Sequence, residues 1–282
     1  MSIEKATLYV VATPLGNLGD ISARAREVLA GVDLIAAEDT RHSARLLQHL
    51  GVTTRCVPLH EHNERQAVPR LIRHLGEGQA LALISDAGTP LVSDPGYALV
   101  RAARAAGFTV VPVPGPSALI AALSVAGLPT DRFAFEGFLP PKAGARAAYL
   151  AALREEPRTL VFYEAPHRVV DTLAAMREAF GGAREAVVAR ELTKRYETVR
   201  SGTLDALIDW IQGDANQQKG EFVLLVAGAP APPRRELSAE ARRVLEALAA
   251  ELPVAQAVAL AQRITDAPRK ALYDAALALK AQ

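Results

Sequence analysis

The chain alternates short apolar runs with segments of helical periodicity, and this alternation limits the folds it can adopt. In the first half the apolar runs lie at residues 7–12, 33–37, 81–84 and 109–113. Segments with helical spacing lie at residues 22–30, 40–50, 63–75 and 95–106. Short runs without polar alternation are typical of strands covered on both faces. Strands that alternate with helices therefore predict a mostly parallel α/β sheet.

The residue pattern changes at residues 112–127, where prolines lead into an apolar helix. We interpret this segment as the joint between two domains. Further strands are predicted at residues 133–139, 159–163, 186–191, 196–201 and 221–226. Further helices are predicted at residues 143–153, 166–180 and 204–212. Because only a short turn separates the strands at 186–191 and 196–201, this second sheet should be mixed.

A proline-rich linker is predicted at residues 229–235, followed by helices at 238–250, 254–264 and 269–279. The predicted fold is thus α/β, with one domain at 7–115, a second at 116–229 and a three-helix tail at 236–282.

The composition indicates a cytoplasmic protein. The single cysteine, Cys56, excludes a disulfide framework and fits a reducing compartment. The first six residues carry no apolar signal segment, and no run approaches the roughly 20 apolar residues of a membrane-spanning helix. The formal net charge is only +1, so that binding to nucleic acid would have to depend on local basic patches.

The most specific motif is SDAGTPLVSDPG at residues 85–96, which follows a predicted strand and precedes a helix. Such a segment lies at the carboxyl edge of the sheet, where open α/β sheets bind ligands. The alternative is a purely structural turn. No G-x-G-x-x-G follows the first strand and no G-x-x-x-x-G-K-[ST] occurs, which disfavours nicotinamide oxidoreductases and nucleotide-hydrolysing enzymes.

Two more turns are positioned to meet this motif, at residues 13–17 and 113–118. Ser117 precedes a helix, so its role is either ligand contact or helix capping. Tyr163 ends a strand, where an aromatic face suits a cationic ligand, although core packing is the simpler role.

Polar clusters lie at residues 38–42, 60–64 and 190–196. His60 and His62 have a spacing that could hold a metal, but no third ligand is evident and no metal site is predicted. The simpler interpretation is a hydrophilic loop in which Asn63 caps the helix that follows. The basic turn at 190–196 is more often a solvated hairpin than a site.

Taken together, these segments resemble the tetrapyrrole methylase family, the class III S-adenosylmethionine methyltransferases. The resemblance extends in order over nearly the whole chain. The segments that carry it are LYVVATPLGNLGDIS (8–22), AAEDTRHSARLL (36–47), LISDAGTPLVSDPG (83–96), VPVPGPSALIAAL (111–123), FEGFLP (135–140), FYEAPHR (162–168), ARELTKRYE (189–197) and GEFVLLV (220–226).

The resemblance implies a homodimer of chains in which S-adenosylmethionine lies in a cleft between two α/β domains. Where tetrapyrrole members read Gly-Asp-Pro, this chain has Gly88, Thr89 and Pro90, so Asp86 is the candidate substitute for the missing carboxylate. The implied cofactor-binding residues are Pro14, Leu15, Asp86, Gly88, Thr89, Val92, Ser117, Ala118 and Tyr163.

The segments EDTRHS and HEHNE resemble the branch of the family that methylates ribosomal RNA. This implies 2′-O-methylation of a cytidine ribose in the decoding region of small-subunit (16S) ribosomal RNA, with that RNA or the assembled small subunit as partner. Our hypothesis for the proton acceptor is Asp39, His60 or Glu64, with Lys194 or Arg41 lowering the effective pKa of the hydroxyl. The candidate phosphate partners are Arg41, Arg45, Arg65 and Lys194.

Two other functions remain open on the sequence. A C-methyltransferase acting on a porphyrin or corrin precursor would share the cofactor cleft but need no RNA surface. A nonenzymatic nucleic-acid-binding protein would use the tail alone and bind no cofactor. The basic residues of the tail have either an RNA-binding role or a packing role.

Overall fold

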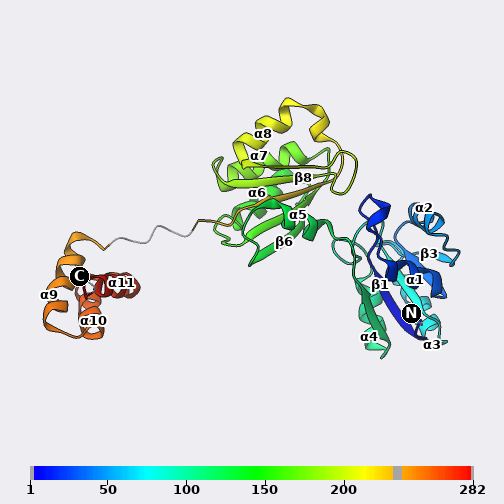
Figure 1. Cartoon of the computed structure of the whole chain (residues 1–282), viewed down its shortest axis with the longest axis horizontal. Helices are drawn as coiled ribbons and strands as arrows, with labels where there is room; N and C mark the ends of the chain where they lie inside the picture. The colour runs from blue at the N-terminus through cyan, green and yellow to red at the C-terminus, as the bar shows by residue number, and fades with distance from the viewer. Residues whose placement is uncertain (1–2, 231–236, 281–282) are drawn as a thin grey trace. The chain divides into compact units, whose positions relative to one another are not determined.

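The computed structural model describes residues 3–230 and 237–280, and the chain forms two compact units, Met1–Ala229 and Pro230–Gln282. Most of the linker predicted at 229–235 lies outside the described residues. Figure 1 shows two sheets in the first unit and only helices in the second.

The first sheet is entirely parallel, which confirms the prediction from the alternating pattern, and its strand order is β3-β2-β4-β1-β5. Its strands are β1 (Thr7–Val11), β2 (Leu34–Ala37), β3 (Cys56–Pro58), β4 (Leu81–Ile84) and β5 (Thr109–Val113). The helices between them are η1 (Leu18–Asp20, a 3-10 turn), α1 (Ala23–Gly31), α2 (Thr40–Leu50), α3 (Glu64–Gly76) and α4 (Tyr97–Ala105).

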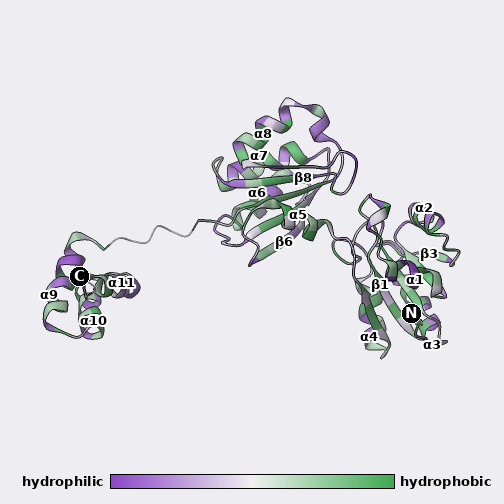
Figure 2. Ribbon diagram, viewed as in Figure 1, coloured by the Kyte–Doolittle hydropathy of each residue, from purple (hydrophilic) through white to green (hydrophobic). Residues whose placement is uncertain are grey.

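Helices cover both faces of this sheet, because successive side chains of each strand point to opposite faces. On β1, Tyr9 packs in one cluster with residues of α1 and α2, while its neighbour Leu8 packs in another with residues of α3 and α4. Figure 2 shows the hydrophobic residues gathered along the strands. The helices pack on the two faces of the sheet, so the carboxyl ends of β1 and β4 continue into loops at its edge and are not covered by the core.

The second sheet is mixed, as the short turn between two of its predicted strands indicated. Its order is β6-β7-β10-β8-β9, and β6 and β7 are its parallel pair. The strands are β6 (Phe133–Phe138), β7 (Thr159–Glu164), β8 (Glu185–Arg190), β9 (Thr198–Thr203) and β10 (Phe222–Val226). The helices are α5 (Ala118–Ala126), α6 (Ala143–Ala152), α7 (Val169–Phe180), α8 (Leu204–Gly213) and η2 (Ala215–Gln218). Helix α5 packs on one face, and α6, α7 and α8 pack on the other.

Strand β3 has no counterpart among the predicted elements. It contains only three residues, of which two are half-buried and the last, Pro58, is exposed. An edge strand is the place where a sheet tolerates proline, and so short a run carries little hydrophobic signal. Its presence extends the parallel sheet beyond β2.

The second unit consists of α9 (Ala239–Glu251), α10 (Val254–Thr265) and α11 (Arg269–Lys280), close to the predicted bounds. Ser238 caps α9 by accepting a hydrogen bond from the N–H of Ala241 at 3.0 Å. A small core of Leu245, Val258 and Leu272 holds the three helices together. Among residues 3–230 and 237–280, no helix is both long and apolar enough to cross a bilayer.

Candidate active site

The loops that follow β1 and β4 are joined by paired backbone hydrogen bonds. The N–H of Thr13 donates to the carbonyl of Gly88 at 2.8 Å, and the N–H of Gly88 donates back at 3.0 Å. The buried hydroxyl of Thr13 also donates to the carbonyl of Ser85 at 3.1 Å. From the β4 loop, the hydroxyl of Thr89 donates to the carbonyl of Pro116 at 3.0 Å, just before α5. The three predicted turns therefore converge.

Gly88 has a backbone conformation that favours glycine, with φ of +84°. A Cβ atom at this position would lie 3.2 Å from Cδ2 of Leu15 and 3.8 Å from the carbonyl oxygen of Pro116. The absence of a side chain thus lets the β4 loop approach both neighbouring loops. Leu91 and Ser93 in the same loop also have positive φ angles, of 73° and 68°, a conformation that costs non-glycine residues energy and is concentrated at functional sites.

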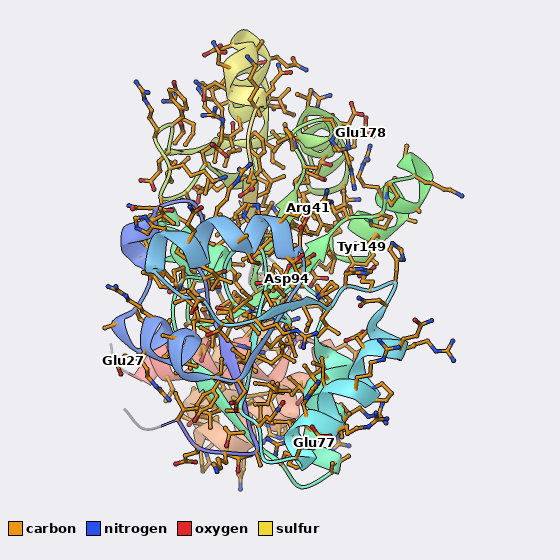
Figure 3. All side chains as sticks on the ribbon, turned by 90° about the vertical axis from the view of Figure 1, so that its right-hand side faces the viewer. Glu27, Arg41, Glu77, Asp94, Tyr149 and Glu178 are labelled. Atoms are coloured by element: carbon orange, nitrogen blue, oxygen red, sulfur yellow. The ribbon has the colours of Figure 1, made fainter. Side chains whose placement is uncertain are left out.

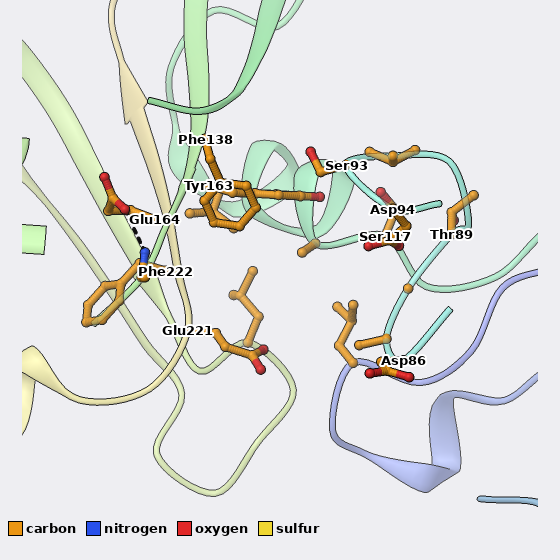
Figure 4. A pocket seen from close by; sticks show the side chains of 18 of the residues that line it. Asp86, Thr89, Ser93, Asp94, Ser117, Phe138, Tyr163, Glu164, Glu221 and Phe222 are labelled. Atoms are coloured by element: carbon orange, nitrogen blue, oxygen red, sulfur yellow. Dashed lines mark hydrogen bonds between the residues drawn. The ribbon is translucent and has the colours of Figure 1, made fainter. Parts of the chain in front are cut away.

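The converging loops and the ends of β7 and β10 enclose a cavity of about 380 Å³, which we call the first cavity (Figure 4). This volume lies within the range of small-molecule sites. Its lining comes from both sheets of the first unit: Leu15, Glu38, Asp86, Ala87, Gly88, Thr89, Val92, Ser93, Asp94, Ser117, Ala118, Phe138, Tyr163, Glu164, Ala165, Pro166, Ala189, Leu192, Glu221, Phe222 and Val223.

Every charged side chain that lines the first cavity is a carboxylate, and no lysine, arginine or histidine is among the lining residues. Burial, followed by the charge of Asp86, raises the pKa of Glu38. Burial, together with the charges of Glu38 and Asp86, raises the pKa of Asp94 to about 6, against a hydrogen bond from Ser85 that lowers it. Mutual repulsion makes this carboxylate cluster favour either a proton or a cationic ligand.

Tyr163, at the end of β7, fixes the start of α5. Its hydroxyl accepts a hydrogen bond from the N–H of Leu119 at 3.1 Å. Its ring packs edge-to-face on Phe135 and Phe138, with centroids 4.8 and 5.8 Å away. Because the first N–H groups of a helix have no partner within the helix, this hydroxyl satisfies a group that would otherwise be unpaired.

Replacing Tyr163 by phenylalanine is expected to lower the free energy of unfolding by about 0.5–2 kcal/mol, because the N–H of Leu119 loses its acceptor. Thermal unfolding monitored by circular dichroism measures this change. The matched control is Tyr149→Phe, which removes a hydroxyl bonded to Glu136 at an exposed position and should change stability by less than about 0.5 kcal/mol. Equal effects of the two substitutions would contradict the role of Tyr163.

A second cavity, of about 450 Å³, adjoins the first. The two share Leu15, Asp86, Ala87 and Glu221, which form the boundary between them. The remaining lining residues of the second cavity are Pro14, Gly16, Leu18, His42, Ser43, Arg45, Leu46, Ser85 and Lys194. Unlike the first cavity, this one includes basic side chains.

Lys194 bridges the two carboxylates beside the boundary. Its Nζ lies 3.0 Å from Oε1 of Glu191 and 3.0 Å from Oε2 of Glu221. These carboxylates raise its pKa, although burial opposes them. Its aliphatic stem lies over Gly16, where a side chain would collide with it. Lys194 thereby ties the loop after β8 to the loop after β1 and holds Glu221 in place.

The residues with an implied cofactor role lie together. All of them except Pro14 line the first cavity, and Pro14 lines the second. Ser117 occupies the cap position of α5 but makes no capping hydrogen bond through its side chain, so its hydroxyl remains available to the cavity that it lines.

Of the five residues in our catalytic hypothesis, Lys194 is the one that lines either of these two cavities. Asp39 caps α2 by accepting hydrogen bonds from the N–H groups of Arg41 and His42, and these bonds lower its pKa. Glu64 accepts from the N–H groups of Gly96 and Ala98, each at 3.2 Å, and so caps α4. His60 also lies outside both cavities. The side chain of Arg41, labelled in Figure 3, is 93 % exposed.

The lining residues of the first cavity that were not among our sequence candidates include Glu38, Asp94, Phe138 and Glu221. Glu38 and Asp94 lie inside motifs that we singled out, directly after β2 and in the second half of the β4 loop. An acidic residue at the carboxyl end of a parallel strand is the signal that could have identified Glu38. Phe138 and Glu221 carried no such signal, because strand pairing in the second sheet brings them to the cavity.

Among the described residues, no group of three or more histidine, cysteine or acidic side chains is arranged to hold a metal.

Comparison with known families gives matches to two models. The model of the Tetrapyrrole (Corrin/Porphyrin) Methylases matches residues 7–208, and the model of the RsmI C-terminal HTH domain matches residues 235–280. The first match covers both sheets apart from the last strand, and the second covers the three-helix unit.

Curated relatives match nearly the full length. A Pseudomonas aeruginosa protein named "Ribosomal RNA small subunit methyltransferase I" is 61% identical over 272 residues, which cover 96% of each chain. A protein of the same name from Escherichia coli O157:H7 is 53% identical over 270 residues, covering 96% of this chain and 94% of that one.

Solved structures share the fold. The X-ray structure of a cobalamin biosynthetic enzyme, cobalt precorrin-4 methyltransferase, matches with a TM-score of 0.59 and 16% identity, covering 79% of this chain and 95% of that one. A structure of diphthine synthase matches with a TM-score of 0.58 and 18% identity, covering 78% and 90%.

The first cavity fits the methyl donor of this family, S-adenosylmethionine, which presents a sulfonium cation. Carboxylates supply opposite charge, and the rings of Tyr163 and Phe138 supply aromatic surface of the kind that attracts cations. The sequence matches, the shared fold and this cavity lead to one conclusion: the chain is an S-adenosylmethionine-dependent methyltransferase and belongs to the tetrapyrrole (corrin/porphyrin) methylase family.

Proposed function

We propose that this enzyme methylates the 2′-oxygen of a cytidine ribose in the decoding region of small-subunit (16S) ribosomal RNA. The observation that carries methyl transfer to an anionic acceptor is the first cavity, whose charged lining is entirely carboxylate and which adjoins a second cavity with basic residues. The basic side chains of the second cavity would attract an anionic substrate to the neighbourhood of the donor. Relatives at 61% and 53% identity named "Ribosomal RNA small subunit methyltransferase I" support the choice of RNA.

Methyl transfer is an in-line displacement in which the carbon–sulfur bond breaks as the oxygen–carbon bond forms. S-adenosylmethionine, when bound, supplies the activated methyl group. The chain aligns the donor and the ribose hydroxyl and takes up the proton that the hydroxyl loses. In this proposal the carboxylates of Glu38 and Asp94 hold the positive end of the donor, and Tyr163 and Phe138 close the cavity over it.

We assign the role of proton acceptor to Asp86. It lines both cavities, so its carboxylate lies where donor and acceptor would meet. Burial is the main reason that the pKa values of Glu38 and Asp94 are raised, and the charge of Asp86 raises both further. When the positive charge of the donor disappears on transfer, the repulsion within this cluster returns and favours uptake of one proton. Asp39 is less suited, because its hydrogen bonds stabilise the ionised form.

Acting in the cytoplasm on the assembled small subunit, the enzyme would reach a nucleotide splayed out of its stack. Phosphate contacts would be added by basic residues of the three-helix unit that are exposed among the side chains the structure describes: Arg242, Arg243, Arg263, Arg269 and Lys270. Dimerisation is supported by large apolar side chains exposed on both edges of the second sheet, Phe133 on β6 and Val199 on β9.

The runner-up is C-methylation of a porphyrin or corrin precursor. Structures with such names support the fold alone, because their identity to this chain is 16% to 23%. The basic second cavity does not separate the two substrates, since tetrapyrrole precursors are also anionic. The length and identity of the match to rRNA methyltransferases favour RNA.

The test is transfer of labelled methyl from S-adenosylmethionine to small subunits from a strain that lacks the enzyme, followed by mass mapping of the RNA. The expected result is one 2′-O-methylated cytidine in the decoding region. Parallel reactions use naked small-subunit RNA and uroporphyrinogen. Label on uroporphyrinogen, with none on either form of the RNA, would replace the proposal with the runner-up.

The affinity for S-adenosylmethionine is expected to fall as the pH is lowered through about 6, where Asp94 takes up a proton. A bound cation favours the ionised carboxylate, so the complex holds fewer protons than the free enzyme. The weakening between pH 7.5 and 5 should be up to about tenfold, the equivalent of one pKa unit. Calorimetric titration across this range measures it.

The matched variant is Asp94→Asn, which should bind the donor more weakly at pH 7.5 and show a flatter profile that retains only the contribution of Glu38. In the absence of ligand, the pH dependence of the protein's stability has the opposite sign to that of donor binding. Because the pKa of Asp94 is raised in the folded state, its stabilising contribution is full below about pH 4 and is lost as the pH rises through 6. An unchanged pH profile of donor binding in Asp94→Asn would contradict this assignment.

A further inference from the structure

Both apolar and basic side chains line the second cavity. Leu15 and Leu46 line it together with Leu18, a large apolar side chain that is 41 % exposed on the turn η1. Arg45 and His42, both exposed on α2, lie on the same lining. A nucleotide has matching parts: a base and sugar with apolar faces, and a phosphate that binds cations.

Ser43 provides an independent observation. Its side chain is 2 % exposed and lines the second cavity, yet its hydroxyl has no hydrogen-bond partner among the residues that the structure describes. A buried hydroxyl without a partner costs about 1–3 kcal/mol, so such groups are uncommon in native proteins. Rotation of the Ser43 side chain toward the cavity would let a polar ligand group satisfy this hydroxyl.

Lys194 is not free to act as the phosphate-binding cation. Its Nζ is already in contact with Glu191 and Glu221, both at 3.0 Å. Its contribution is to position Glu221, which belongs to the boundary between the cavities, and to close the side of the second cavity next to Gly16. Arg45 and His42 are therefore the groups that would meet a phosphate.

We infer that the second cavity is the acceptor site, which takes one unstacked nucleotide. In this assignment Leu15, Leu18 and Leu46 contact the base or sugar, Arg45 and His42 contact the flanking phosphate, and Ser43 donates to or accepts from a polar atom of the nucleotide. The ribose hydroxyl then faces the boundary at Asp86. The inference rests on the proposed function for the identity of the acceptor, and it adds the residues that select a nucleotide.

The experiment measures RNA binding and methyl transfer separately. Binding is followed by fluorescence anisotropy with a fluorescein-labelled single-stranded RNA pentamer that has a central cytidine, at saturating S-adenosylhomocysteine. Ser43→Ala is expected to weaken pentamer binding about twofold to tenfold, the range for one neutral hydrogen bond, and to leave thermal stability unchanged or raised. Arg45→Gln is expected to weaken binding and to reduce the salt slope by about 1.

The controls are Ser201→Ala on β9 and Arg104→Gln on α4, exposed positions that line neither cavity. Both should bind the pentamer and small subunits as the wild type does. In methyl transfer, Ser43→Ala and Arg45→Gln should raise KM for small subunits and keep the affinity for S-adenosylmethionine. A merely structural role of Ser43 would instead lower the thermal stability and weaken donor binding.

The outcomes separate this inference from the proposed function. Wild-type pentamer affinity and KM in both variants would overturn the acceptor site, even if the enzyme methylates small-subunit RNA. Failure of the wild type to bind the pentamer would also overturn it. Conversely, pentamer binding that depends on Ser43 and Arg45, in an enzyme that transfers no methyl to small-subunit RNA, would support the site and refute the proposed function.

Discussion

Asp86→Asn is expected to lower kcat for methyl transfer by about 10²–10⁴-fold, the usual contribution of a positioned proton acceptor. The substitution preserves shape. The oxygen of asparagine can still accept the hydrogen bond that the N–H of Asp39 donates to Oδ1 of Asp86 at 3.1 Å. It removes the basicity and one negative charge from the cluster with Glu38 and Asp94. Single-turnover transfer of labelled methyl at saturating donor measures the chemical step.

Two further readouts distinguish proton acceptance from donor binding. Affinity for S-adenosylmethionine should weaken by no more than about tenfold, since the other carboxylates of the first cavity remain. With one charge removed, the pKa values of Glu38 and Asp94 should fall, so the pH dependence of donor binding should shift to lower pH. The matched control is Asp171→Asn, at an exposed position of α7, which should leave kcat and donor affinity unchanged. A loss in kcat below tenfold would remove Asp86 as the proton acceptor.

Gly88→Ala is expected to abolish measurable donor binding at micromolar concentrations and to destabilise the protein by about 1–2 kcal/mol. The stability loss comes from the φ of +84°, which disfavours a residue with a Cβ. The binding loss comes from the new methyl group, which would lie 3.2 Å from Cδ2 of Leu15 and displace this side chain, a lining residue of the first cavity. Calorimetry with S-adenosylmethionine and thermal unfolding measure the two effects.

Gly107→Ala separates these effects. Gly107 has a nearly identical φ of +80°, but a Cβ there would meet no atom within 4 Å, and the residue lines neither cavity. It should therefore lose a similar amount of stability and keep full affinity for the donor. If both variants bound the donor equally well, the close approach at Gly88 would have no part in forming the site.

The sheets show which features of the fold could be predicted from local sequence. The apolar runs at β1, β2, β4 and β5 predicted a parallel sheet because burial on both faces requires continuous apolar residues. The short turn between β8 and β9 predicted an antiparallel pair, since a brief connection cannot carry a crossover. Strand β3 was not predicted, because its three residues owe their conformation to pairing with β2.

The same contrast holds within the site. The glycine–proline motif and the aromatic end of β7 identified Gly88, Ser117 and Tyr163 as candidates, and the structure brings them to one cavity. Asp39 and Glu64 looked equally suited to catalysis in sequence. Each instead satisfies the free N–H groups at a helix start, Asp39 in its own helix and Glu64 in α4, which is distant in sequence.

By itself, the sequence determined the two α/β sheets, the helical tail, the loops that form the site and the family. These depend on periodicity and on short motifs, which are local properties of the chain. Only the folded chain shows which carboxylates face the first cavity, that Lys194 lies between Glu191 and Glu221, and that the buried hydroxyl of Ser43 has no partner among the described residues. The physical reason is that the pKa of a carboxyl, the pairing of a charge and the satisfaction of a hydroxyl depend on neighbours that only folding brings within a few ångströms.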